Sequence, residues 1–228
     1  MTFQYDYPRP MLTVDIFALR IDSGKLQLLL IQRKHDPFAG KWALPGGFVG
    51  MEEQLLQSAS RELREETGLA GCQLIPLFLA DEPERDPRGR TVTQVFGTIL
   101  IHPSTTIIAG DDAASAQWFP LNNLPALAFD HQQLVQRSLP ELRSLALFKL
   151  AILDFFSEKF STDELEKICA ALFNGPGIST VILEMALKMK MIRKLEQNFY
   201  QKTTTNTMIQ PPDFFLLSAH WLNQRNSR

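Results

Sequence analysis

The chain has 228 residues, enough for one large domain or two small ones. Hydrophobic residues make up 45% and charged residues 21%, which excludes a wholly disordered chain and predicts a packed core. The formal net charge of -2 argues against strong non-specific binding to nucleic acid.

Cysteine usage and the apolar runs indicate the compartment. Cys72 and Cys169 lie far apart, which fits a reduced protein and predicts neither a disulfide framework nor a zinc site. The longest apolar stretches, residues 28–31 and 145–148, are far shorter than the roughly 20 residues that cross a membrane. Residues 1–10 lack the pattern of a signal peptide. We therefore expect a soluble, cytoplasmic protein that does not bind membranes.

The first part of the chain predicts strands separated by loops. The expected strands are residues 11–19, 26–31, 72–80, 91–101 and 116–119. A helix is expected over residues 52–67, ended by Gly68, with Leu56, Ala59 and Leu63 as its buried stripe. This order of strands and helices indicates a layered α/β domain over residues 1–139.

The pattern changes after a shorter helix that is expected to begin near Asp130, and residues 140–228 predict a second, mainly helical domain. Ser161 and Glu164 form a capping box, and helical spacing relates the residues that follow: Leu165, Ile168, Cys169, Leu172 and Phe173. After a turn at residues 174–177, a second helix is expected from Ser179, with an apolar stripe that reaches Ile192. Two short strands are expected, at residues 198–205 and 214–217. Two helices, a turn and a hairpin predict a small winged-helix-like α+β module.

The segment that carries chemistry is residues 47–69. Glu62, Glu65 and Glu66 share one helical face, so their side chains lie about 5–6 Å apart. Oxygen ligands of this kind suit Mg²⁺. An isolated acidic cluster is more often a solvated helix face. However, the wider segment fixes seven residues and two apolar positions, a pattern expected by chance on the order of once in ten million such chains.

This segment matches the signature of the Nudix hydrolases at every position, and the chain resembles that family. The resemblance implies an α/β/α sandwich with a mixed sheet. It also implies that Mg²⁺ or Mn²⁺ supports hydrolysis of a nucleoside diphosphate linked to another group. By position, the implied metal ligands are the Gly46 carbonyl and the carboxylates of Glu62, Glu65 and Glu66. The implied catalytic residues are Glu62 and Glu66, supported by Arg61 and Glu53. The proton acceptor stays open among the box glutamates, Glu82, Glu84, Asp111 and Asp112.

Further segments indicate which nucleoside diphosphate derivative is the expected substrate. Residues 7–10, 37–49, 85–90 and 127–131 are similar to the ADP-ribose pyrophosphatase branch, which implies hydrolysis of ADP-ribose to AMP and ribose 5-phosphate. The substrate-binding candidates are Arg33, Phe48, Arg88, Arg90 and His131. The loop at residues 85–90 offers three guanidinium groups, whose forks match phosphate oxygens. The alternative for residues 85–90 is a solvated loop that does not contact substrate. The alternative for His131 is a helix-capping or packing role.

Some members of this branch carry a C-terminal winged helix and regulate transcription of NAD metabolism, and the architecture here is similar. The alternative function is therefore an ADP-ribose-sensing DNA-binding protein. However, residues 179–185 contain no Lys or Arg, and the expected wing, residues 198–207, contains only Lys202. We therefore expect an enzyme without specific DNA binding, whose second module packs on the first or forms a homodimer.

Overall fold

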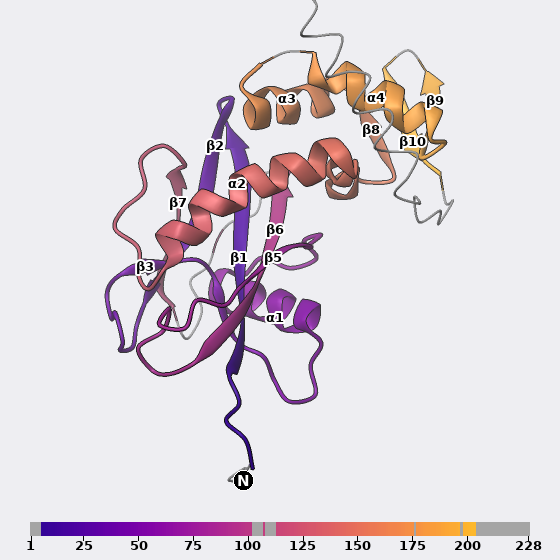
Figure 1. Cartoon of the computed structure of the whole chain (residues 1–228). Coiled ribbons are helices and arrows are strands. Elements are labelled where there is room, and N and C mark those ends of the chain that lie inside the picture. The colour runs from indigo at the N-terminus through magenta and orange to yellow at the C-terminus, as the bar shows by residue number, and fades with distance from the viewer. Residues whose placement is uncertain (1–5, 102–106, 108–112, 176, 197, 204–228) are drawn as a thin grey trace, which may run out of the picture. The chain divides into compact units, whose positions relative to one another are not determined.

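The computed structural model describes residues 6–101, 107, 113–175, 177–196 and 198–203. The chain divides into two units, residues 1–142 and 143–228, which we describe separately. The elements that begin in the first unit are β1 (Met11–Asp22), β2 (Lys25–Arg33), β3 (Trp42–Ala43), β4 (Gly46–Phe48), α1 (Leu55–Thr67), β5 (Ile75–Ala80), β6 (Thr91–Leu100), β7 (Ala113–Pro120) and α2 (His131–Phe148) (Figure 1).

The first unit is built on a mixed sheet with helices on both faces. In the described residues the sheet has seven strands, ordered β3-β2-β1-β6-β5, with β4 paired to β1 and β7 paired to β2. β1 and β6 are parallel, and the other pairs are antiparallel. In Figure 1, α1 lies behind the sheet and α2 in front of it. β1 is consequently buried on both faces, and Ile16 and Phe17, which point to opposite faces, are both fully buried.

The predicted strands are present, and two more occur between them. β3 and β4, with two and three residues, are too short to give a periodic pattern. β5 begins at Ile75 and not at residue 72. β4 pairs with β1, which brings Gly46 opposite Asp15 and Gly47 opposite Val14. This pairing places the glycines of the signature at the centre of the domain.

The signature helix is α1, which starts at Leu55 and not at residue 52. Gln54, which precedes it, has an extended backbone with φ -75° and ψ 153°. The helix ends where expected, because Gly68 adopts the left-handed conformation at φ 74°. The inclusion of Leu56 in the buried stripe is wrong, since this residue is 48% exposed. Leu55 packs against the core instead, beside the buried residues Ala59 and Leu63.

The second unit contains three helices and a small antiparallel sheet with strand order β8-β10-β9 in its described part. Its elements after α2 are η1 (Ala151–Phe155), β8 (Lys159–Ser161), α3 (Thr162–Phe173), α4 (Ile178–Lys188), β9 (Ile192–Glu196) and β10 (Phe199–Lys202). The capping box is confirmed: Ser161 Oγ accepts the Glu164 N–H at 3.2 Å, and Glu164 Oε2 accepts the Ser161 N–H at 2.7 Å.

Of the two strands expected in this unit, residues 198–205 contain β10, whose partners in the described part of the chain include β9. Ile192 starts β9 and does not continue the helical stripe, and β9 pairs with β10. Residues 214–217 lie outside the described part of the chain. The β9–β10 hairpin therefore carries Arg193 and Lys194 in addition to Lys202, so the expectation of a single basic residue there is wrong.

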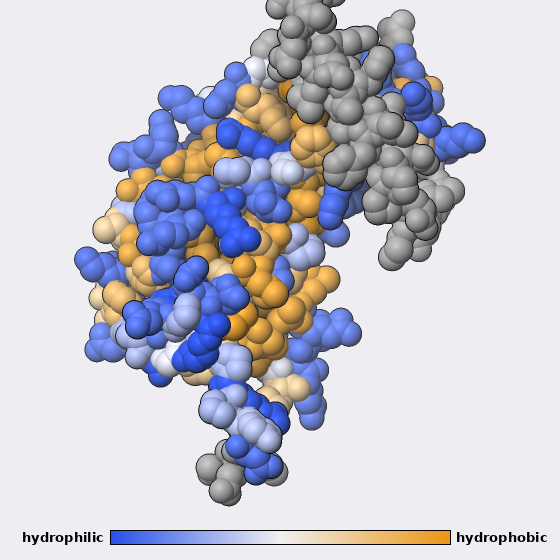
Figure 2. Space-filling view, viewed as in Figure 1, coloured by the Kyte–Doolittle hydropathy of each residue, from blue (hydrophilic) through white to orange (hydrophobic). Residues whose placement is uncertain are grey.

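The described helices include none that is long and apolar enough to cross a membrane. Figure 2 shows hydrophilic side chains over much of the face seen in Figure 1, with apolar side chains between them. Large apolar residues are nevertheless exposed near the N-terminal end of the first unit, including Tyr7, Phe48 and Met51. Together they line an open groove beside β4.

Candidate active site

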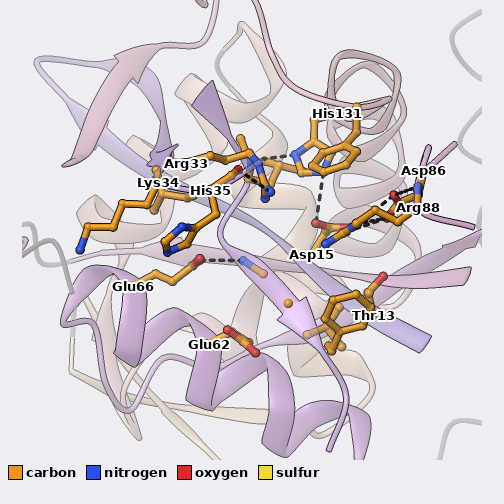
Figure 3. A pocket seen from close by; sticks show the side chains of 18 of the residues that line it. Thr13, Asp15, Arg33, Lys34, His35, Glu62, Glu66, Asp86, Arg88 and His131 are labelled. Atoms are coloured by element: carbon orange, nitrogen blue, oxygen red, sulfur yellow. Dashed lines mark hydrogen bonds and ion pairs between the residues drawn. The ribbon is translucent and has the colours of Figure 1, made fainter. Parts of the chain in front are cut away.

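A pocket of about 440 Å³ in the first unit gathers most of the predicted site residues. Eight of the eleven line it: Arg33, Gly46, Phe48, Arg61, Glu62, Glu66, Arg88 and His131. Figure 3 shows Glu62 and Glu66 extending from α1 on one side of the pocket, with Arg33, Arg88 and His131 on the other. The pocket thus has an acidic wall and a basic wall.

The acidic wall depends on two glycines of β4. The Gly46 N–H donates to Glu66 Oε2 at 2.9 Å. A Cβ atom on Gly47 would lie 2.5 Å from Glu62 Oε1, and one on Gly46 would lie 2.2 Å from the Val14 carbonyl oxygen. Glu62 therefore approaches the β4 backbone in space that a side chain at position 47 would fill, whereas glycine at position 46 lets β4 lie close to β1.

Arg61 connects the acidic side chains. Its guanidinium donates to both oxygens of Glu53, at 2.7 and 2.9 Å, to Glu62 Oε1 at 2.8 Å and to Glu65 Oε2 at 3.1 Å. It also donates to the Phe48 carbonyl at 3.2 Å. The hydrogen bonds from Arg61 lower the pKa of Glu53 to about 2, and those to Glu53 raise the pKa of Arg61. Arg61 therefore compensates several negative charges and ties β4 to α1.

Two of the predicted residues on this side do not reach the pocket. The Glu65 side chain is 50% exposed and pairs with Arg61, while Glu53 supports Arg61 from the adjoining groove. Among the described residues, no three acidic, histidine or cysteine side chains converge as a ready metal cage. Two box carboxylates, Glu62 and Glu66, therefore face the pocket, whereas Glu65 is half exposed and does not line it.

The basic wall contains Arg33, at the end of β2, and Arg88. Asp86 accepts from Arg88 Nε at 3.0 Å and from Nη2 at 2.7 Å. The Arg88 guanidinium also lies 5.0 Å from the ring centroid of Phe48 and 5.4 Å from that of Phe129. Arg33 lies 4.8 Å from the same Phe129 centroid. Burial, followed by the charge of Arg88, lowers the pKa of Arg33. Two guanidinium groups are thus held close together despite their repulsion.

The expectation of three phosphate-facing guanidinium groups in the loop at residues 85–90 is wrong. The Arg85 side chain is only 5% exposed and donates to both oxygens of Asp130, at 2.9 and 2.8 Å. Arg90 donates to the Asp81 carbonyl and does not line the pocket. Arg88 is the member of this loop that presents its guanidinium to the pocket without such burial.

His131 lies in the pocket wall with protein partners at both ring nitrogens. Its Nδ1 accepts the Leu44 N–H at 2.9 Å, and its Nε2 lies 3.4 Å from Asp15 Oδ1. Asp15 Oδ2 accepts from Thr93 Oγ1 at 2.7 Å and lies 3.6 Å from Arg85 Nη2. Burial lowers the pKa of His131, although the charge of Asp15 opposes this effect. The geometry favours the packing interpretation of this histidine over direct substrate contact.

Sequence reasoning missed several lining residues. They are Thr13, Asp15, Lys34, His35, Asp36, Asp86 and Phe129. Asp15 could have been recognised from the sequence as a site candidate, because it is a lone acidic residue inside the apolar run of residues 11–19. Of the open proton-acceptor candidates, Glu82 and Glu84 are exposed and do not line the pocket, while Asp111 and Asp112 lie outside the described residues.

Comparisons with known proteins match the chain to one family. Residues 9–139 match the family model of the NUDIX domain. The chain is 46% identical over 110 residues to an ADP-ribose pyrophosphatase of Methanocaldococcus jannaschii. The aligned region covers 48% of this chain and 64% of that protein. It is 34% identical over 167 residues to the ADPR responsive transcriptional repressor NtrR of Acinetobacter baylyi, which covers 72% of this chain and 66% of the relative. The chain thus spans slightly less than two thirds of each relative.

A solved structure extends the similarity over both units. The crystal structure of Shewanella oneidensis NrtR complexed with a 27mer DNA matches with a TM-score of 0.65 and 28% identity. The match covers 84% of this chain and 93% of that chain.

Proposed function

The chain belongs to the Nudix family, and from this membership we propose that it hydrolyses ADP-ribose to AMP and ribose 5-phosphate with Mg²⁺ or Mn²⁺. The observation that carries the proposal is the opposition of two walls in one pocket. Glu62 and Glu66 form the acidic wall, and Arg33 and Arg88 form the basic wall. A diphosphate and a divalent cation need such neighbouring sites of opposite charge.

The acidic wall suits a hard divalent cation. Its donors are carboxylate and backbone oxygens, and the missing Cβ atom of Gly47 leaves room beside Glu62. Glu62, Glu66 and the Gly46 carbonyl would hold the cation, with Glu65 at the edge of the site. When bound, the cation would neutralise phosphate oxygens and lower the pKa of a coordinated water.

The protein's own residues bind and orient the substrate. Arg88 is fixed by Asp86 and by two aromatic rings, so its guanidinium can bind a phosphate group with little loss of side-chain entropy. Arg33 adds a second positive charge. Arg61 keeps Glu62 oriented toward β4, and Phe48, which lines both the pocket and the adjoining groove, offers a ring to the nucleoside part of the substrate.

A second candidate function is an ADP-ribose-sensing DNA-binding protein. It is favoured by Arg193 and Lys194, which are exposed on the β9–β10 hairpin. It is also favoured by the similarity to the repressor NtrR and to the NrtR structure complexed with DNA. Against it, the first half of α4 has no basic residue, although the leading turns of such a helix contact bases. We keep the enzyme as the main proposal, with the second unit as a winged-helix-like module.

A substrate panel with Mg²⁺ tests the proposal. It compares ADP-ribose, NADH, nucleoside-diphosphate sugars, deoxynucleoside triphosphates and diadenosine polyphosphates, with Glu62→Gln as the matched inactive control. We expect ADP-ribose to give the highest kcat/KM. Faster turnover of a triphosphate or diadenosine polyphosphate by wild type, lost in Glu62→Gln, would reject the substrate and keep the reaction class.

A gel-shift titration separates the two candidates. It uses the DNA upstream of the protein's own gene at about 100 mM salt, with and without ADP-ribose. Sub-micromolar, sequence-selective binding that ADP-ribose abolishes would establish the sensor, because non-specific contact typically gives about 10⁻⁴–10⁻⁶ M. The enzyme proposal predicts no such binding.

A further inference from the structure

The backbone just before the two glycines is held by hydrogen bonds from two sides. On the side of β1, the Ile16 N–H donates to the Pro45 carbonyl at 2.8 Å. On the side of α2, the Ala128 N–H donates to the Trp42 carbonyl at 2.8 Å, and His131 Nδ1 accepts the Leu44 N–H at 2.9 Å. Among these contacts, His131 supplies the one made by a side chain.

Further contacts hold His131 on the Nε2 side of its ring. Its Nε2 faces Asp15 Oδ1, and the second oxygen of Asp15 accepts from Thr93. Arg85 approaches Asp15 and binds Asp130, the residue next to His131, with two hydrogen bonds. Contacts from β1, β6, the loop at residues 85–90 and the start of α2 thus fix the imidazole.

The hydrogen bonds also fix the tautomer of the ring. Because Nδ1 accepts the Leu44 N–H, it carries no proton, so the neutral ring has its proton on Nε2, toward Asp15. Burial lowers the pKa of His131, which supports the neutral form. A protonated ring would present a donor to the Leu44 N–H and lose this contact.

We propose that His131 is a positioning residue for the cation site, acting through the Leu44 N–H on the backbone that leads into β4. Leu44 precedes Gly46 by two residues, and the Gly46 N–H holds Glu66 at 2.9 Å. Fixing Leu44 therefore fixes the backbone that meets both box carboxylates. The inference rests on the proposed function, because it assumes a cation beside Glu62 and Glu66.

Two substitutions separate this role from packing. His131→Asn places an amide oxygen near the position of Nδ1 and can keep the Leu44 contact. His131→Gln places its amide near Nε2 and loses that contact. Gln132→Ala, at the exposed next position of α2, is the matched control. Mn²⁺ binding is measured by electron paramagnetic resonance without substrate, and exchange of the Leu44 amide proton is measured by NMR.

We expect His131→Gln to weaken Mn²⁺ binding about 10-fold and to speed exchange at Leu44, since residues behind a metal site typically contribute about 10–100-fold. His131→Asn should stay within about 2-fold of wild type in both measurements. Wild-type Mn²⁺ affinity in His131→Gln, or equal losses in both variants, would overturn the inference. If His131→Gln does not fold, the inference is tested by Mn²⁺ binding and Leu44 amide exchange in His131→Asn alone. A 10-fold loss of Mn²⁺ affinity in His131→Asn would then overturn the inference. A wild-type protein that binds Mn²⁺ but does not hydrolyse ADP-ribose would reject the proposed function alone.

Discussion

Arg61 binds Glu53 with two parallel hydrogen bonds, Nε to Oε1 at 2.7 Å and Nη2 to Oε2 at 2.9 Å. Glu53 precedes α1 and also accepts the Gly50 N–H at 3.1 Å, whereas Arg61 lies inside the helix. The same guanidinium reaches Glu62 in the pocket. One bidentate pair therefore connects the loop after β4 with the carboxylate that faces the substrate.

The box carboxylates should control turnover. We expect Glu62→Gln and Glu66→Gln each to lower kcat at least about 100-fold, because each removes negative charge that would hold the cation. The fold should persist, since each substitution also relieves repulsion between like charges. Steady-state kinetics and thermal melting measure the two effects. Near-wild-type turnover in both variants at saturating Mg²⁺ would contradict the metal assignment.

Arg88→Ala should raise KM more than it lowers kcat. Hydrogen bonds to Asp86 fix the guanidinium, so we expect it to bind the ground state and the transition state alike. Lys25→Ala is the control, because it removes a positive charge from an exposed residue at the start of β2 that does not line the pocket. A lower kcat with unchanged KM would give Arg88 a role in the transition state instead.

Mg²⁺ should stabilise the fold without being required for it. Glu62 pairs with Arg61, and Glu66 accepts the Gly46 N–H, so contacts within the protein hold both carboxylates. We therefore expect a chelator to abolish turnover and leave a cooperative melting transition. Adding Mg²⁺ at 100 times its Kd should contribute about 2.7 kcal/mol to the free energy of unfolding. Calorimetry of a Glu62→Gln, Glu66→Gln double variant should show no such shift, and an equal shift there would place the cation elsewhere.

His131 should make stability depend on pH near neutrality. Burial lowers its pKa below 6.5, Asp15 and Asp130 oppose this, and Arg85 and Arg33 add to it. The unfolded ring gains a proton as the pH falls below about 6.5, before the folded ring does, so stability falls with pH in this window. Between about pH 7.5 and 5.5 the Tm of wild type should fall more than that of His131→Asn. Equal slopes would exclude the ring as the cause.

The sequence predicts features that depend on neighbouring residues, because local geometry alone determines them. The capping box of Ser161 and Glu164 and the left-handed cap at Gly68 are of this kind. The end of α4 was not predictable in this way. Its turn places Lys190 at φ 57°, a conformation usually adopted by glycine, so the apolar spacing toward Ile192 falsely extended the helix.

The site residues also divide into those predictable from neighbouring residues and those that depend on the whole fold. Glu62 and Glu66 could be assigned from spacing, because both lie on one helix. The contact between Asp15 and His131 joins β1 to the start of α2, 116 positions away in the sequence, and only the folded sheet brings them together. The burial of Arg85 has the same origin, since its partner Asp130 is 45 positions away. A basic residue in a polar loop gives no sign that an acidic partner will bury it.

The two adjacent glycines differ in what a single methyl group would do to the molecule. At Gly46 it would meet the Val14 carbonyl oxygen, which belongs to the central strand and cannot move without disturbing the sheet. At Gly47 it would meet the end of the Glu62 side chain, which can rotate away. The first change damages the fold, whereas the second leaves a folded protein with a displaced carboxylate. One nucleotide change at codon 47 would thus separate the proposed catalysis from ligand binding by Arg33 and Arg88.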